Sequence, residues 1–126
     1  MVDAEKHIEY WRKGSEEDWD VAHELLASGR IRHSLFFAHL ALEKVLKAHV
    51  CRRTQDIAPR IHRLDRLAEI AGISPSPDHK RILVRMNDFN LKGRYPEPLA
   101  GLPTAAEARG YLANAQEAYE WLMKQL

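Results

Sequence analysis

Three polar side chains, His39, Glu43 and Lys47, recur at four-residue intervals in an otherwise apolar segment. In a helix each four-residue step turns by about 40°, so the three side chains would share one face. A lysine there can hold a phosphate, and Glu43 can hold the cation in place when no ligand is bound. The alternative is an ordinary Glu43–Lys47 surface pair, which stabilises a helix by only about 0.3–0.5 kcal/mol.

Metal and cofactor chemistry lack the patterns that they need. Seven histidines and one cysteine are present, but His39 and Glu43 would need two more converging ligands to hold zinc, and neither HExxH nor CxxC occurs. There is no GxxxxGK(S/T) or GxGxxG phosphate loop and no GxSxG elbow. The sequence therefore predicts no metal and no cofactor, with structural or surface roles for the histidines.

Charge is unevenly distributed, although the net charge is only +1. Residues 1–29 hold three basic and eight acidic side chains, whereas residues 30–66 hold nine basic and three acidic ones. The two segments can pair within the fold or across a dimer, or the basic segment can attract nucleic acid. Five arginines lie between residues 52 and 66, but no aromatic residues alternate with them, which weakens the case for a single-strand groove.

The segments that must position these residues have helical periodicity. Apolar positions from Ile8 to Leu26 form one stripe of a first helix, and Gly29 is a natural stop. Residues 34–49 are apolar around nearly the whole circumference, which predicts a central second helix. Between residues 34 and 48, the only charged side chains on that helix are those of Glu43, Lys44 and Lys47.

Further helices are predicted after Pro59. A short one ends near Gly72, a fourth runs from a Ser76 cap to about Gly93, and the last begins at Thr104 with a capping-box pattern. Residues 93–103 hold three prolines and two glycines, so they should form a non-helical connection. The prediction is one all-α domain over residues 1–126, an up-and-down bundle of four to five helices.

Compartment follows from what the chain lacks. No stretch approaches the roughly 18 apolar residues of a membrane span, and the N-terminal residues have no apolar signal-peptide core. The single Cys51 cannot form an internal disulfide. We expect a cytoplasmic protein with no membrane partner.

Three segments together resemble the successive signatures of HEPN domains. They are SLFFAHLALEKVLKAHV at residues 34–50, IHRLDRLAEIAG at 61–72 and NDFNLKGRYPE at 87–97. The most specific piece is AxEKxLKA, from Ala41 to Ala48. The resemblance implies a polar ligand-binding set at His39, Glu43, Lys44, Lys47, His62, Arg94 and Tyr95.

The resemblance also implies partners and activities. HEPN proteins commonly form homodimers, and many prokaryotic members pair with a minimal nucleotidyltransferase as toxin and antitoxin. Others are metal-independent ribonucleases that use an arginine and a later histidine with four to six residues between them. This chain departs from that pattern, because Arg94 is followed there by Leu99, Ala100 and Gly101, and no histidine lies beyond His79. Arg32 and His39 have a similar spacing, but matches of this kind are expected by chance among twelve arginines and seven histidines.

Three hypotheses remain open. The first is a non-catalytic module that binds a nucleotide, RNA or a nucleotidyltransferase, the second a structural dimer, and the third a ribonuclease. A binding module should turn its cations toward a cleft, and a structural protein should satisfy them internally. A ribonuclease should bring an arginine and a histidine together across a dimer axis. The sequence favours the first hypothesis and predicts no catalytic residue.

Overall fold

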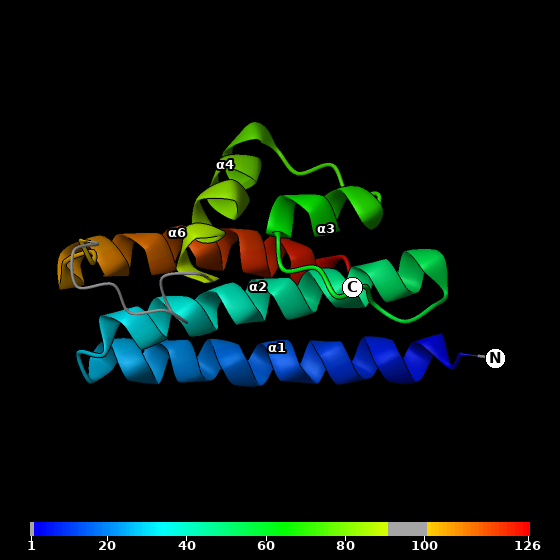
Figure 1. Cartoon of the computed structure of the whole chain (residues 1–126), viewed down its shortest axis with the longest axis horizontal. Coiled ribbons are helices and arrows are strands. Elements are labelled where there is room, and N and C mark those ends of the chain that lie inside the picture. The colour runs from blue at the N-terminus through cyan, green and yellow to red at the C-terminus, as the bar shows by residue number, and fades with distance from the viewer. Residues whose placement is uncertain (1, 91–100) are drawn as a thin grey trace.

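The computed structural model describes residues 2–90 and 101–126, and every regular element in those ranges is a helix. Three long helices, α1 (Ala4–Ala27), α2 (Ile31–Thr54) and α6 (Ala105–Lys124), pack together, while α3 (Leu64–Ile70) and α4 (Pro77–Met86) lie on the side opposite α1 (Figure 1). α1 runs opposite to α2, and α6 runs in the same direction as α2. The predicted all-helical bundle is confirmed, and none of these helices is long and apolar enough to cross a membrane.

α2 is the centre of the bundle, as its apolar circumference predicts. It packs against each of the other four helices, and 14 of its 24 residues are buried. Its largest fully buried side chains include Leu35, Leu42 and Leu46. Burial of this apolar surface is the main favourable term in forming the bundle. Any charged group on the middle turns of α2 must therefore find a partner inside the protein.

The antiparallel pair of α1 and α2 is joined by a tight glycine turn and a hydrogen bond, and an aromatic contact joins α1 to α6. Gly29 takes a φ of +80° in the turn between them, a conformation that glycine adopts without a steric penalty. The Ser34 hydroxyl donates to the Ala22 carbonyl across the pair, at 2.7 Å. Near the same contact, Trp19 of α1 stacks on Tyr119 of α6 with ring centroids 4.8 Å apart. Both long neighbours of α2 are thus fixed to one another as well.

The predicted helix starts are present with their capping contacts. The Ser76 side chain accepts from the His79 backbone N–H at 3.1 Å, and Pro77 stands at the first helical position. Thr104 and Glu107 form the predicted capping box at the start of α6.

The end of the fourth helix differs from the prediction. α4 ends at Met86, and a further helical turn covers residues 88–90; Gly93 lies outside the described residues. Asn87 stands at this break, and its side chain serves another helix. Its amide oxygen accepts from the Leu64 backbone N–H, and its amide nitrogen donates to Asp65, both at 2.8 Å. The N-cap residue of α3 makes no side-chain cap, so Asn87 supplies the missing acceptor.

Candidate functional site

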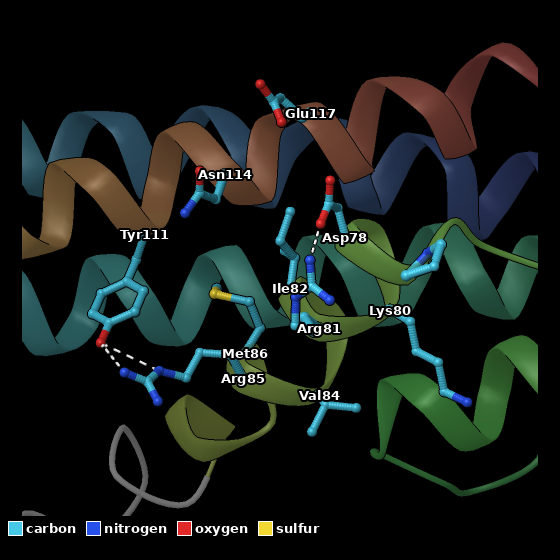
Figure 2. Close-up of a pocket in the computed structure, with 11 residues that line it drawn as sticks. Asp78, Lys80, Arg81, Ile82, Val84, Arg85, Met86, Tyr111, Asn114 and Glu117 are labelled. Carbon is cyan, nitrogen blue, oxygen red and sulfur yellow. Dashed lines mark hydrogen bonds and ion pairs between the residues drawn. The ribbon is translucent and has the colours of Figure 1, made fainter.

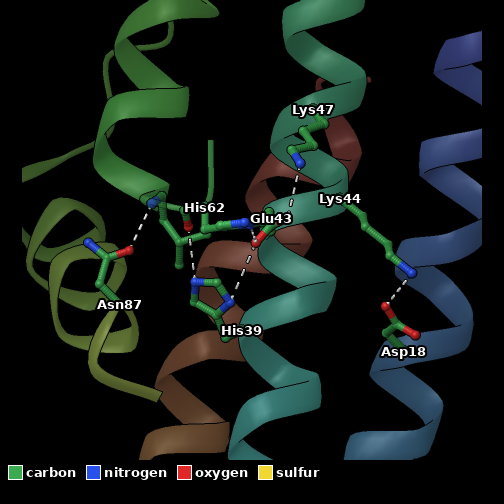
Figure 3. Close-up of polar contacts among 8 residues, drawn as sticks. Asp18, His39, Glu43, Lys44, Lys47, His62 and Asn87 are labelled. Carbon is green, nitrogen blue, oxygen red and sulfur yellow. Dashed lines mark hydrogen bonds and ion pairs between the residues drawn. The ribbon is translucent and has the colours of Figure 1, made fainter. Parts of the chain in front are cut away.

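Polar side chains gather at two candidate places in the described structure. One is an open groove between α4 and α6 (Figure 2). The other is a cluster on the face of α2 that turns toward the segment before α3 (Figure 3). The sequence patterns drew attention only to the second place.

The four-residue spacing on α2 does place His39, Glu43 and Lys47 together. Their side chains are almost completely buried, with exposed fractions of 0%, 6% and 7%. The segment before α3 adds His62, whose side chain is 50% exposed. The cluster therefore lies inside the bundle and reaches solvent at His62, which makes it very different from an ordinary surface pair.

The carboxylate of Glu43 is the centre of this cluster. Lys47 Nζ lies 3.1 Å from Oε2, and His62 Nδ1 lies 3.2 Å from both carboxylate oxygens, to which it donates. His39 Nδ1 lies 3.8 Å from Oε1. One carboxylate is thus surrounded by an ammonium and two imidazoles, an arrangement that compensates a buried negative charge.

The outer members of the cluster are also held. His39 Nε2 donates to the backbone carbonyl of His62 at 3.1 Å. α2 therefore contacts the segment before α3 through both the side chain and the backbone of His62. Lys47 Nζ lies over the ring of Trp11 on α1, 5.2 Å from its centroid. The cations turn inward to Glu43 and Trp11 and do not face a cleft. This arrangement is the one expected of a structural protein, whose charges are paired internally.

Lys44 does not join the cluster. Its ammonium lies 2.7 Å from an Asp18 carboxylate oxygen on α1, on the opposite side of α2 (Figure 3). A Cβ added at Gly14 would lie only 3.1 Å from Lys44 Cδ, so the missing side chain at Gly14 leaves room for the lysine stem. This contact pairs the acidic first segment with the basic second segment within the fold, as one of the two interpretations of the charge pattern expects.

Arg94 and Tyr95 lie outside the described residues. Their predicted place beside Glu43 therefore remains a prediction.

Histidines elsewhere show how burial changes imidazole chemistry. His49 Nε2 donates to the Leu122 carbonyl at 2.8 Å inside the contact of α2 with α6. Burial lowers the pKa of His49, since it penalises the charged imidazolium. Within residues 2–90 and 101–126, no three His, Cys, Asp or Glu side chains are arranged to hold a metal ion.

The groove contains the residues that sequence reasoning missed. Arg85 of α4 donates to the Tyr111 hydroxyl of α6 at 2.7 Å, and its guanidinium also lies over the Tyr111 ring. Lys80 and Arg81 line the same wall. The sequence did hold a signal for this groove. Lys80, Arg81 and Arg85 lie within six residues of one short helix, so cations are at least as frequent there as between residues 52 and 66.

The burial of Glu43 generates a stability prediction. Glu43→Ala removes the partner of Lys47 and leaves a buried cation, so the free energy of unfolding should fall by about 2–4 kcal/mol in urea titrations. The matched control is Glu69→Ala, which removes a carboxylate that is 62% exposed and pairs with Arg66 at 3.0 Å. That control should lose less than about 1 kcal/mol. Equal, small losses in both variants would show that Glu43 behaves as surface.

Comparisons with known proteins agree with this geometry. A family model for the HEPN domain matches residues 8–126. The crystal structure of TT1696 from Thermus thermophilus has a TM-score of 0.80 at 20% identity, over 94% of this chain and 98% of that one. The crystal structure of ST0689, an archaeal HEPN homologue, has a TM-score of 0.72 at 22% identity, over 94% and 96% of the two chains. A search of curated protein sequences finds no match. From the extent of the family match, the chain belongs to the HEPN domain family.

Proposed function

We propose that this chain is a non-catalytic HEPN module that forms a homodimer and binds a nucleotidyltransferase, in a toxin–antitoxin-like pair. The observation that carries the non-catalytic part is the burial of His39, which is 0% exposed. Its Nε2 is hydrogen-bonded to the His62 carbonyl, and its Nδ1 faces Glu43. A general acid or base must come within hydrogen-bonding reach of the substrate proton, so His39 is poorly placed to serve RNA cleavage.

The internal pairing of the cluster argues against catalysis at this place and gives the cluster a structural role. Catalysis of phosphoryl transfer needs donors aimed at a reacting phosphate, whereas Lys47 is aimed at Glu43. A buried ion pair adds little stability over an apolar pair of similar size, yet it fixes the relative position of the segments that carry it. The cluster thus builds a defined surface out of α2 and the segment before α3.

Exposed apolar side chains support association. Tyr10, Ile57, Val84 and Leu102 have exposed fractions of 68%, 58%, 44% and 52%. Where such groups form a continuous patch, they mark surfaces at which proteins bind one another. The nucleotidyltransferase as partner comes from the HEPN family itself, in which such pairs occur.

A nucleotide ligand is the second candidate, and the exposure of His62 favours it. Nδ1 of His62 is bonded to Glu43, which leaves its other ring nitrogen for a ligand at the solvent-facing end of the cluster. A nucleotide there would receive a phosphate contact from Arg94 and a stacking contact from Tyr95, as the resemblance implies.

RNA cleavage tests the non-catalytic part of the proposal. Purified protein incubated with RNA and a chelator should leave the RNA intact, because Arg94 has no histidine at the family spacing and the histidine of the Arg32–His39 pair is buried. If cleavage occurs and is lost in Arg32→Ala as well as in His39→Ala, the spacing of this pair is functional and the proposal is wrong.

Light scattering tests the assembly. Alone at micromolar concentration, the protein should have twice the 14.5 kDa mass of the chain. After mixing with a minimal nucleotidyltransferase encoded beside it, a larger species containing both proteins should elute. A particle of 14.5 kDa would contradict the predicted homodimer, and separate elution of the two proteins would contradict the predicted partner.

Calorimetry with a panel of nucleoside mono-, di- and triphosphates tests the second candidate. Arg94→Ala should abolish binding with little change in melting temperature, because a ligand-binding arginine contributes little to the empty fold. Arg109→Ala, an exposed arginine on α6, is the matched control and should bind normally. A lower melting temperature in Arg94→Ala with unchanged binding would instead make Arg94 a structural anchor.

A further inference from the structure

The groove between α4 and α6 is separate from the Glu43 cluster. It is open and has a volume of about 900 Å³. Ile82 and Met86 contribute apolar surface between the two helices, and Val84 is an exposed apolar residue at its edge, with 44% of its surface in solvent. A hollow of this size with an apolar base is characteristic of sites that bury part of a ligand or partner.

Of the three cations on the α4 wall of the groove, two lack a carboxylate partner among the described residues. Arg81 is paired with Asp78 on its own helix. Arg85 donates instead to the neutral hydroxyl of Tyr111, at 2.7 and 3.3 Å, and this contact raises the pKa of Arg85 above its ordinary value. Neither Arg85 nor Lys80 forms an ion pair with the residues described. Tyr111 thus fixes a guanidinium at the rim without neutralising it (Figure 2).

The opposite wall has a different character. On α6 the groove is lined by Tyr111, Asn114 and Glu117, which follow one another at helical spacing. The two walls therefore differ in charge, with cations along α4 and an amide and a carboxylate along α6. A ligand that fits both walls must be acidic on one edge only.

The aromatic chemistry of the groove argues against nucleic acid as its occupant. Single strands bind by stacking bases on exposed aromatic rings. Tyr111 is the groove's aromatic side chain, and its ring already contacts Arg85, 5.3 Å away, and Phe89, 5.2 Å away. The remaining apolar surface is aliphatic, which suits the side chains of a protein better than bases.

We propose that this groove docks an amphipathic helix of a partner protein, with acidic residues along the edge that meets α4. The inference rests on the proposed role as a partner module and names the kind of element that binds. Lys80 and Arg85 have no carboxylate partner among the described residues, and Arg81 lies one helical turn before Arg85, so an acidic edge on a second helix matches this wall. Glu117 calls for a basic residue on the other edge of that helix. The apolar stripe between the two edges covers Val84 and Ile82.

The charge of the whole molecule guides such a partner to this side. Residues 60–85, which contain α3 and α4, hold six basic and three acidic side chains. α1, which lies on the far side of the bundle, holds seven acidic and three basic ones (Figure 1). An acidic partner is therefore attracted to the α3 and α4 side and repelled by the other.

Binding of synthetic peptides tests the proposal. The probe is a helix of about four turns with leucine along one stripe, glutamate along one edge and lysine along the other. The control peptide has the same composition with its glutamates and lysines distributed over both edges. In ¹H–¹⁵N spectra of the full chain, only the probe should shift the amides of α4 and α6. Equal binding of both peptides, or shifts confined to other helices, would overturn the proposal.

Variants of the protein make the test specific. Arg85→Glu and Val84→Asp should each lower the affinity for the probe by about tenfold or more, the usual effect of reversing or burying a charge at a contact. Arg109→Glu is the control, since it makes the same charge change on α6 outside the groove and should change affinity by less than about twofold. Unchanged affinity in both groove variants would overturn the assignment, and melting curves establish that each variant is folded.

Two other occupants give different results. If a short single-stranded RNA shifts the same amides and loses affinity in Arg85→Glu, the groove binds nucleic acid and the helix proposal fails. If Val84→Asp converts the protein to a monomer in light scattering, the groove is an interface between copies, and the proposal fails equally.

The outcome is independent of the nucleotidyltransferase experiment. If the Arg85→Glu variant still forms the complex with the nucleotidyltransferase, the proposed function stands and the groove is not its docking site. Selective binding of the probe without complex formation would retain the groove and overturn the choice of partner.

Discussion

The compensation of one buried carboxylate organises much of this protein. Glu43 lies on the helix that contacts all four others, and water cannot solvate its charge there. Lys47 on the same helix supplies one partner, but His62 must come from the segment that follows α2. The requirement for that second partner draws the chain back against α2 just before α3 begins.

The position of α3 then determines the position of the groove. His62 is fixed by Glu43 and His39, and Leu64, two residues later, donates its backbone N–H to Asn87. Asn87 ends α4, and Arg85 in the last turn of α4 reaches across to Tyr111 of α6. A continuous series of polar contacts therefore runs from the centre of the bundle to the groove.

The sequence predicts most of the helices because their signals are local. Periodicity, Gly29, the Ser76 cap and the Thr104 capping box each depend on a few neighbouring residues. The capping role of Asn87 escaped prediction because it acts on α3, 23 residues away in sequence. No pattern within the fourth helix contains that information.

The candidate site was predictable to the same extent. Helical spacing correctly put Glu43 beside Lys47, since both residues lie on one helix. The same rule turns Lys44 about 100° away from that face, and the structure pairs it with Asp18 of α1, so only the resemblance placed it in the set. The groove forms where α4 and α6 pack together, which the sequence does not predict. The sequence also does not show that Arg85 binds the neutral hydroxyl of Tyr111 and not a carboxylate.

The two proposed binding places lie at opposite ends of one set of contacts. A ligand at the exposed edge of His62 would touch the group that anchors α3, and a helix in the groove would touch Arg85 at the end of α4. Binding that tightens either end restricts the contacts between them, through Leu64 and Asn87. Such restriction lowers the entropy that the second binding event must remove, and linkage makes the effect reciprocal. A nucleotide at His62 and a partner helix in the groove would therefore strengthen each other's binding, although neither touches the other.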